Sequence, residues 1–104
     1  MAQVSTAIER SVKRFLETAG KERRIAAVYL YGSHVRGTAT EWSDIDVAVV
    51  SPDFTGDLFT MQLALMQLAA RIDDRIEPRA FTPEDFNANN PLVSAIQHTG
   101  IRIV

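Results

Sequence analysis

Residues 32–46 constrain the fold of this chain most, because an apolar, strand-like run leads into them and a second one begins at their end. The first run delivers Gly32 and Ser33, and the second opens with Asp44 and Asp46. Since successive side chains of a strand point to opposite faces, the two aspartates share one face and the apolar residues that alternate with them face the core. Two strands therefore bring a small-residue turn and two carboxylates to one place.

A pair of carboxylates on one strand face is typical of a site for a divalent cation. Like charges this close repel, and one pKa rises unless a cation lies between them. Proteins hold Mg²⁺ beside substrate phosphates with one or two carboxylates, so Asp44 and Asp46 are candidate metal ligands. Gly32 and Ser33 suit a turn that a phosphate approaches, and Arg36 offers a positive charge to the same anion. The sequence therefore predicts a metal–phosphate site.

The spacing of these residues resembles a known signature. Gly32-Ser33, ten intervening residues and Asp44-Ile45-Asp46, with Gly37 and Ser43 inside the spacer, resemble the signature of the nucleotidyltransferase superfamily whose fold is that of DNA polymerase beta. At 104 residues, the chain resembles the minimal, MNT-type members of that superfamily in particular. The signature covers the first half of the chain directly and the second half only by pattern.

The resemblance implies an α/β (α+β) fold, with a small mixed sheet, helices packed on one face and the acidic residues on the open side. It implies transfer of a nucleotidyl group, AMP from ATP, to a hydroxyl acceptor with release of pyrophosphate. Asp44 and Asp46 would bind two Mg²⁺ ions. Ser33 and the Gly32 turn would clamp the β and γ phosphates, with Arg36 assisting.

In the resembled family a third carboxylate from a later strand completes the metal site. Residues 75–81 read as that strand, with Glu77 on one face and Pro78, which cannot donate a ladder hydrogen bond, indicating a sheet edge. We select Glu77, although the related enzymes mostly carry aspartate there. Asp73 and Asp74 are the alternatives, and a surface ion pair with Arg75 or Arg79 is the competing interpretation of Glu77.

Composition limits the partners and the compartment. The length indicates a single domain over residues 1–104, and a net charge of −2 gives no positive field that would draw the protein to nucleic acid or an anionic membrane. Cysteine is absent, which excludes disulfides and thiolate metal sites. No apolar run approaches the roughly 20 residues of a membrane span, and the N-terminus reads as a polar helix start. We expect a cytoplasmic protein.

The remaining elements follow from periodicity and capping signals. Thr6 and Glu9 form a candidate capping box at the start of a helix over residues 5–19, which Gly20 ends. Asp57 is a candidate N-cap for a helix that runs to about residue 71. The sequence further predicts a short helix over 82–86, a helix over 91–99, and either a last strand or a frayed end over 101–104.

The helix over residues 58–70 contains no charged residue, which is unusual for a helix with one face in water. Two interpretations are open: the helix is wedged deeply into its own domain, or it exposes an apolar surface to a partner. For several polar or aromatic residues a functional role is conceivable, but we expect a structural role. They are His34, Trp42 (packed under the loop or stacked on a base), Ser43 and His98.

Since 104 residues suffice for one domain, we expect no acceptor-binding domain beside it. For minimal nucleotidyltransferases the resemblance implies a separately encoded helical partner of the HEPN type, whose tyrosine is adenylylated in a toxin–antitoxin pair, this chain being the antitoxin. A catalytically silent module that sequesters such a partner is the alternative of another class. A small-molecule transferase acting on an antibiotic is a further alternative, disfavoured because we expect no second domain that would bind the drug. Polymerisation of nucleic acid is disfavoured because the sequence has no basic stripe.

Overall fold

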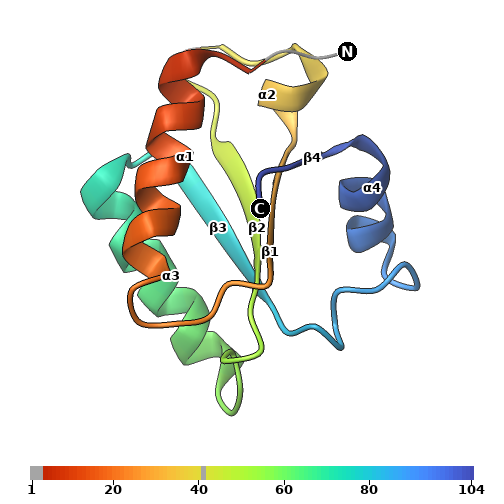
Figure 1. Ribbon diagram of the computed structural model, residues 1–104. Helices are drawn as coiled ribbons and strands as arrows, with labels where there is room; N and C mark the ends of the chain where they lie inside the picture. The colour runs from red at the N-terminus through yellow and green to blue at the C-terminus, as the bar shows by residue number, and fades with distance from the viewer. Residues whose placement is uncertain (1–3, 41) are drawn as a thin grey trace.

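The computed structural model describes residues 4–40 and 42–104. Figure 1 shows a four-stranded sheet with helices on both sides. Among the described residues, no helix has the length and apolar character that crossing a membrane requires. The elements in chain order are α1 (Thr6–Ala19), β1 (Ala27–Tyr31), α2 (Ser33–Arg36), β2 (Ile45–Val50), α3 (Leu58–Ile72), β3 (Ile76–Phe81), α4 (Pro91–Thr99) and β4 (Ile101–Arg102).

The sheet is mixed, as the sequence predicts. Its strand order is β3-β2-β1-β4; β1 is antiparallel to β2 and to β4, and β2 and β3 are parallel. A helix, α3, makes the crossover that two neighbouring parallel strands require. Residues 101–104 therefore extend the sheet, because β4 pairs with β1. Pro78 lies on β3, which is an edge strand, and this confirms the prediction that Pro78 marks a sheet edge.

Helices α1 and α3 pack on one face of the sheet and bury the main core. Alternating residues of the strands supply its sheet side, among them Ile45, Val47 and Val49 of β2, which confirms the predicted core face. Helix α4 packs instead against the opposite face, where Val93 and Ile96 meet Ala48, Val50 and Phe81 in a second, smaller cluster. The expectation of helices on one face thus holds for α1 and α3, and α4 adds partial cover to the other.

The helix ends follow the capping signals with one correction. Ser5, not Thr6, is the N-cap of α1, since its side chain accepts a hydrogen bond from the Ile8 amide at 3.2 Å. Asp57 caps α3 by accepting from the amides of Phe59 and Thr60, as the sequence predicts. Helix α4 begins after Asn90, which accepts from two amides of its first turn, and ends at Gly100.

Two short segments differ from the sequence prediction. The connection after β1 contains a one-turn helix, α2, which positive-φ glycines flank on both sides, Gly32 at 85° and Gly37 at 79°. Residues 82–86 form a turn and not a helix. The Thr82 carbonyl accepts from the Asp85 and Phe86 amides, and the chain then leads to Asn90, where α4 starts.

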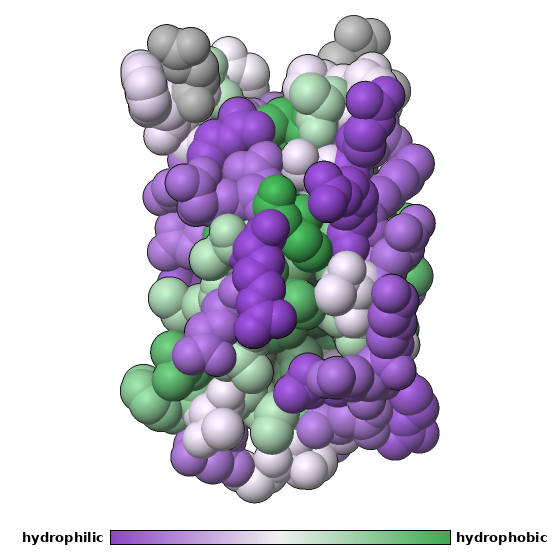
Figure 2. Space-filling model, turned by 90° about the vertical axis from the view of Figure 1, so that its left-hand side faces the viewer, coloured by the Kyte–Doolittle hydropathy of each residue, from purple (hydrophilic) through white to green (hydrophobic). Residues whose placement is uncertain are grey.

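Helix α3 is not wedged deeply into its domain, so the first of the two interpretations is wrong. Only Leu65 and Ala69 are buried, with three further apolar residues partly buried against the core. Phe59, Leu63 and Met66 are 75%, 44% and 47% exposed. Figure 2 views the molecule from the side of α1 and α3 and shows apolar surface between hydrophilic side chains. The charge-free sequence therefore gives α3 one face in the core and one apolar face in water.

Candidate active site

The acidic residues gather on the sheet face opposite to α1 and α3. Tyr31, Asp46 and Glu77 form one row across three neighbouring strands, because β1 pairs Tyr31 with Asp46 and β2 pairs Asp46 with Glu77. Cross-strand neighbours project to the same face. Asp44 lies two residues before Asp46, exposed, where the chain enters β2. The structure thus brings Asp44, Asp46 and Glu77 to one end of the open face.

Gly32 makes this arrangement sterically feasible. Its φ of 85° is one that side chains disfavour, and a Cβ placed there would lie 2.2 Å from the Asp46 Oδ2 atom. The Asp46 carboxyl therefore fills the space that a side chain at residue 32 would need. The Gly32 carbonyl accepts from the amides of Val35 and Arg36 at 3.1 Å, which closes the turn of α2. Ser33 is the first residue of that turn.

The electrostatics show how closely the acidic groups lie. The pKa of Glu77 is raised, first because a proton shared with the Asp44 carboxyl is favoured over two adjacent charges, and then by burial and the Asp46 charge. The pKa of Asp46 is raised by burial and by the Asp44 charge, while the positive charges of Arg36, His34 and Arg79 lower it. The raised pKa values of Asp46 and Glu77 next to Asp44 are typical of acidic groups gathered at a functional site.

The alternatives for the third carboxylate lie outside β3, although Asp74 lines a small pocket together with Asp44 and Glu77. Asp73 pairs with Arg75, whose Nε and Nη2 lie 3.1 and 2.8 Å from its two oxygens, and this pairing lowers the pKa of Asp73 to about 2. Arg75 is therefore occupied by Asp73, and the ion pair of Glu77 with Arg75 does not form. Asp74 is exposed in the turn that precedes β3. Of the three candidates, Glu77 is the one in the row with Asp46.

The other residues of the connection have the following places. Ser43 orders the loop, since its hydroxyl accepts from the Thr40 amide at 2.8 Å, and its carbonyl lies 3.5 Å from Nε2 of His34. Trp42 is 84% exposed, so the expectation that it packs under the loop is wrong. Arg36 is exposed, and its charge acts on Asp46. His98 lies on the surface of α4, with Nδ1 2.7 Å from the Ser94 carbonyl oxygen.

Sequence reasoning missed two members of the site, Tyr31 and Arg79. Burial raises the pKa of the half-buried Tyr31, and the charge and hydrogen bonding of Arg79 lower it in part. Two signals in the sequence could have found them. Tyr31 directly precedes Gly32, and Arg79 lies two residues beyond Glu77 and so shares its strand face. The cross-strand register that unites them with Asp46 was not visible in the sequence.

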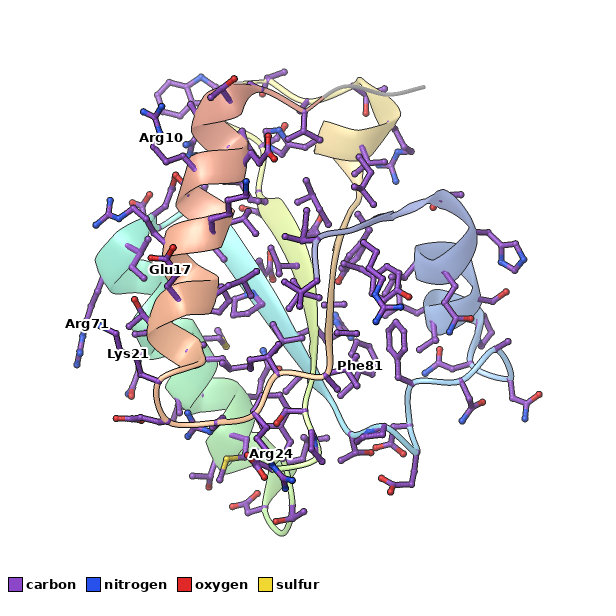
Figure 3. The ribbon with its side chains drawn as sticks, in the orientation of Figure 1. Arg10, Glu17, Lys21, Arg24, Arg71 and Phe81 are labelled. Carbon is purple, nitrogen blue, oxygen red and sulfur yellow. The ribbon has the colours of Figure 1, made fainter. Side chains whose placement is uncertain are left out.

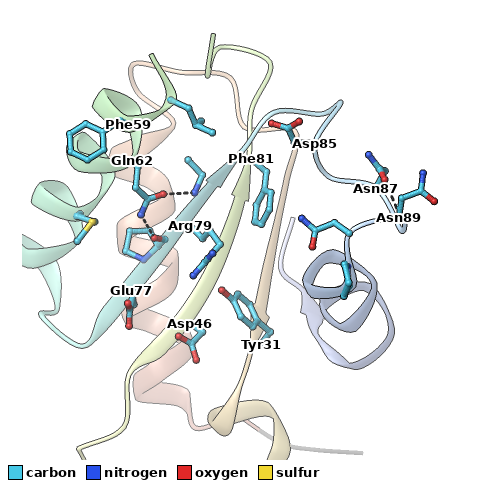
Figure 4. A pocket seen from close by; sticks show the side chains of 16 residues that line it. Tyr31, Asp46, Phe59, Gln62, Glu77, Arg79, Phe81, Asp85, Asn87 and Asn89 are labelled. Carbon is cyan, nitrogen blue, oxygen red and sulfur yellow. Dashed lines mark hydrogen bonds between the residues drawn. The ribbon is translucent and has the colours of Figure 1, made fainter. Parts of the chain in front are cut away.

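A cleft of about 1000 Å³ opens onto this row. Figure 4 shows Asp46, Glu77, Tyr31 and Arg79 at one end, Phe59 of α3 on one wall, and Asn87 and Asn89 of the loop before α4 across from it. Gln62 holds the wall together, since its amide donates to the Pro78 carbonyl at 2.6 Å and accepts from the Ala80 amide at 2.8 Å. The free edge of β3 is thereby occupied at these two groups.

The candidate ligands of a divalent metal are carboxylates from β2, β3 and the segment before β2. Among the described residues no three acidic or imidazole side chains converge on one point as a ready metal site. Asp44 acts on both Asp46 and Glu77, and the charge of Asp46 acts on Glu77 as well. Carboxylate oxygens are hard ligands of the kind that Mg²⁺ takes, so the chemistry of the set fits the ion.

Comparison with known proteins identifies the family. Residues 9–97 match the family described as "Nucleotidyltransferase domain". The chain belongs to this family. The match confirms the resemblance that Gly32-Ser33 and Asp44-Ile45-Asp46 indicate, and the size and fold are consistent with an MNT-type nucleotidyltransferase. No curated protein sequence matches the chain.

Two solved structures share the nucleotidyltransferase fold. A protein from Sulfolobus solfataricus, provisionally described as a nucleotidyltransferase, has a TM-score of 0.65 at 17% identity over 92% of this chain and 78% of that one. A chain from a crystal structure described as "the toxin-antitoxin with AMP-PNP" has a TM-score of 0.67 at 22% identity, covering 92% of this chain and 72% of that one. These similarities confirm the predicted fold class.

Proposed function

We propose that this nucleotidyltransferase transfers AMP from ATP to a hydroxyl group of a partner protein. The observation that carries the proposal is the row of Asp46 and Glu77, with Asp44 beside it, at the end of a wide cleft and next to the Gly32 turn. Phosphoryl transfer depends mostly on positioning of the reactants and neutralisation of charge. A member of this family with such an acidic cluster has the groups for both.

The proposed roles follow from position. Ser33 and the Gly32 turn bind the β and γ phosphates, and Arg36, at the end of the same turn, adds a positive charge. The acceptor oxygen attacks the α-phosphorus, the bond from that phosphorus to the α,β-bridging oxygen breaks, and pyrophosphate leaves with the electron pair. Glu77, on the strand beside Asp46, takes the acceptor proton, directly or through water.

Asp44, Asp46 and Glu77 are the proposed ligands of two Mg²⁺ ions. When bound, these ions would neutralise the triphosphate and stabilise the attacking and leaving oxygens. The chain itself contributes carboxylates at fixed positions on β2 and β3, and the turn that places the triphosphate beside them. The structural relative described as a toxin–antitoxin with AMP-PNP supports a nucleotide of this kind as donor.

The proposed acceptor is a tyrosine of a separately encoded helical protein of the HEPN type, with this chain as the antitoxin of the pair. The toxin–antitoxin relative supports a partner of this kind. The exposed apolar face of α3 supports a protein partner as well, because Phe59 and Met66 line the same cleft as Asp46 and Glu77. A protein seated on that face has a direct path to the acidic row.

The experiment that tests the proposal is intact-mass spectrometry of the protein encoded beside this one, after incubation with ATP, Mg²⁺ and this chain. We expect a mass gain of one or more AMP units, which disappears with Asp44→Asn and Asp46→Asn combined. The proposal fails if the double variant still modifies the partner, or if the wild-type chain binds the partner stably and never modifies it.

A catalytically silent binding module is the second candidate. The observation that favours it is that no three metal-ligating side chains converge within the part of the chain that is described. Calorimetry separates the two functions: a nucleotidyltransferase binds ATP in a Mg²⁺-dependent manner, whereas a silent module binds the partner and shows no heat of ATP binding with or without Mg²⁺.

A further inference from the structure

Arg79 is the guanidinium that β3 places on the site face, two residues beyond Glu77. Its cross-strand neighbour on β2 is Ala48, whose small side chain is fully buried in the second cluster. The Arg79 side chain lies beside Tyr31, with Asp46 below it in the view of Figure 4. Arg79 of β3 thus extends over β2 to the row of Tyr31, Asp46 and Glu77.

The groups that face Arg79 come from three strands. They are Tyr31 of β1, Asp46 of β2 and Glu77 of β3, and the charge of Arg79 acts on each of them. The close ion pairs found in the described part of the chain do not include Arg79. Its guanidinium is exposed in the cleft, so its planar donors are available to an anion that enters there.

The order of groups along the sheet indicates which anion this is. The Gly32 turn lies at one end of the strands. The row of Asp46 and Glu77, called the acidic row, follows it, and Arg79 lies two residues further along β3. The cleft then continues past Phe81 to Asn87 and Asn89. A nucleotide whose β and γ phosphates lie at the Gly32 turn therefore has its α phosphate over the acidic row, within the part of the cleft that Arg79 faces.

We propose that Arg79 binds the α-phosphoryl group that is transferred, and that Tyr31 positions its guanidinium for this contact. The inference rests on the proposed nucleotidyl transfer. Negative charge develops on the α-phosphoryl oxygens as the acceptor attacks, and a bidentate guanidinium stabilises that charge. Arg79 then differs in role from Arg36, which serves the β and γ phosphates at the other end.

The competing role for Arg79 is simple neutralisation of the acidic row. A guanidinium that only offsets carboxylate charge would change the binding of every anionic ligand at the site to a similar extent. A guanidinium that contacts the α phosphate affects ligands that contain this phosphate and spares the others. AMP and pyrophosphate separate the two roles, because AMP contains only the α phosphate and pyrophosphate represents the β and γ phosphates.

The test is calorimetric titration of AMP and of pyrophosphate, each with Mg²⁺, into the wild-type chain and three variants. Arg79→Met is expected to lower AMP affinity roughly tenfold or more and to change pyrophosphate affinity less than about twofold. Arg36→Met is expected to show the reverse selectivity. Arg10→Met is the control, since Arg10 is exposed on α1, on the far side of the sheet (Figure 3).

The outcomes separate this inference from the proposed function. Equal loss of both ligands in Arg79→Met, or no loss of AMP, overturns the role of Arg79 while the proposed function stands. A wild-type chain that binds neither ligand overturns both. Arg79→Lys adds a second check, because it keeps the charge and loses the fork; AMP affinity between those of wild type and Arg79→Met is expected, and full wild-type affinity would argue for charge alone.

Discussion

Gly32 couples the backbone of the turn to the position of Asp46, and a glycine-to-alanine pair tests this. Gly32→Ala introduces a Cβ that meets the Asp46 carboxyl, in addition to strain at φ 85°. Gly56→Ala adds the same kind of strain, at φ 75°, in open space. Both variants are expected to lose about 1 kcal/mol of unfolding free energy. Only Gly32→Ala is expected to lose Mg²⁺-dependent ATP binding as well, by roughly tenfold or more in calorimetry. Equal ATP binding by both variants would show that Asp46 needs no space from Gly32.

The acidic row makes the metal-free protein less stable at neutral pH. The folded-state pKa values of Asp46 and Glu77 are raised, so their protonated forms favour the fold below the unfolded pKa of about 4, and this contribution is lost as pH rises through the folded pKa. Asp44→Asn removes the carboxyl that contributes most to the raised pKa of Glu77. We therefore expect its Tm without metal to exceed that of wild type by roughly 2 °C at pH 7, an increase kept small by solvent screening. The difference should vanish below about pH 4.

Magnesium gives the same comparison a second measurement. Mg²⁺ is expected to raise the Tm of the wild-type chain and to have little effect on Asp44→Asn, because a ligand that binds only the folded state stabilises it. Equal stabilisation of both chains by Mg²⁺ would remove Asp44 from the metal site. A lower Tm of Asp44→Asn at pH 7 would mean that Asp44 is structural.

At the scale of elements, α3 holds the edge strand through Gln62. Its amide bonds the Pro78 carbonyl and the Ala80 amide on either side of Arg79. Gln62→Ala leaves both groups unpaired at the edge and is expected to lose about 1–2 kcal/mol, a fall in Tm of several degrees. Gln67→Ala, an exposed position of the same helix, should lose less than about 0.5 kcal/mol. Thermal unfolding of the two variants measures the contrast, and equal falls would show that the edge needs no such cover.

The same elements show what the sequence can predict. Period-two alternation placed Asp44 and Asp46 on one face and Ile45 on the other, because strand geometry alone decides this. The exposure of Phe59 and Leu63 was not decided by the sequence, since α3 has two apolar stripes and packing against β3 and α1 selects the buried one. The place of Arg79 depends on a register between strands far apart in sequence, which no local pattern specifies.

At the scale of the whole molecule, the sheet separates two tasks. One face buries the core under α1 and α3, and the other presents the acidic row in a cleft with α4 at its far side. Helix α3 belongs to both, because its inner face joins the core while Phe59 and Met66 line the cleft. A partner seated on α3 would therefore meet the molecule next to its site, which makes α3 the surface where binding and catalysis can be separated by mutation.

Leu63 allows that separation, since it is 44% exposed on α3 and does not line the cleft. Leu63→Lys places a charge in the apolar face, and we expect it to lower affinity for the partner encoded beside this chain roughly tenfold or more, because burying an unpaired charge is costly. Binding of ATP with Mg²⁺ should stay unchanged. Gln97→Lys, which adds the same charge at an exposed position of α4, is the control. Calorimetry with the partner and with ATP measures both. Undiminished partner affinity in Leu63→Lys would mean that the partner docks elsewhere, and the exposed face of α3 would then need another explanation.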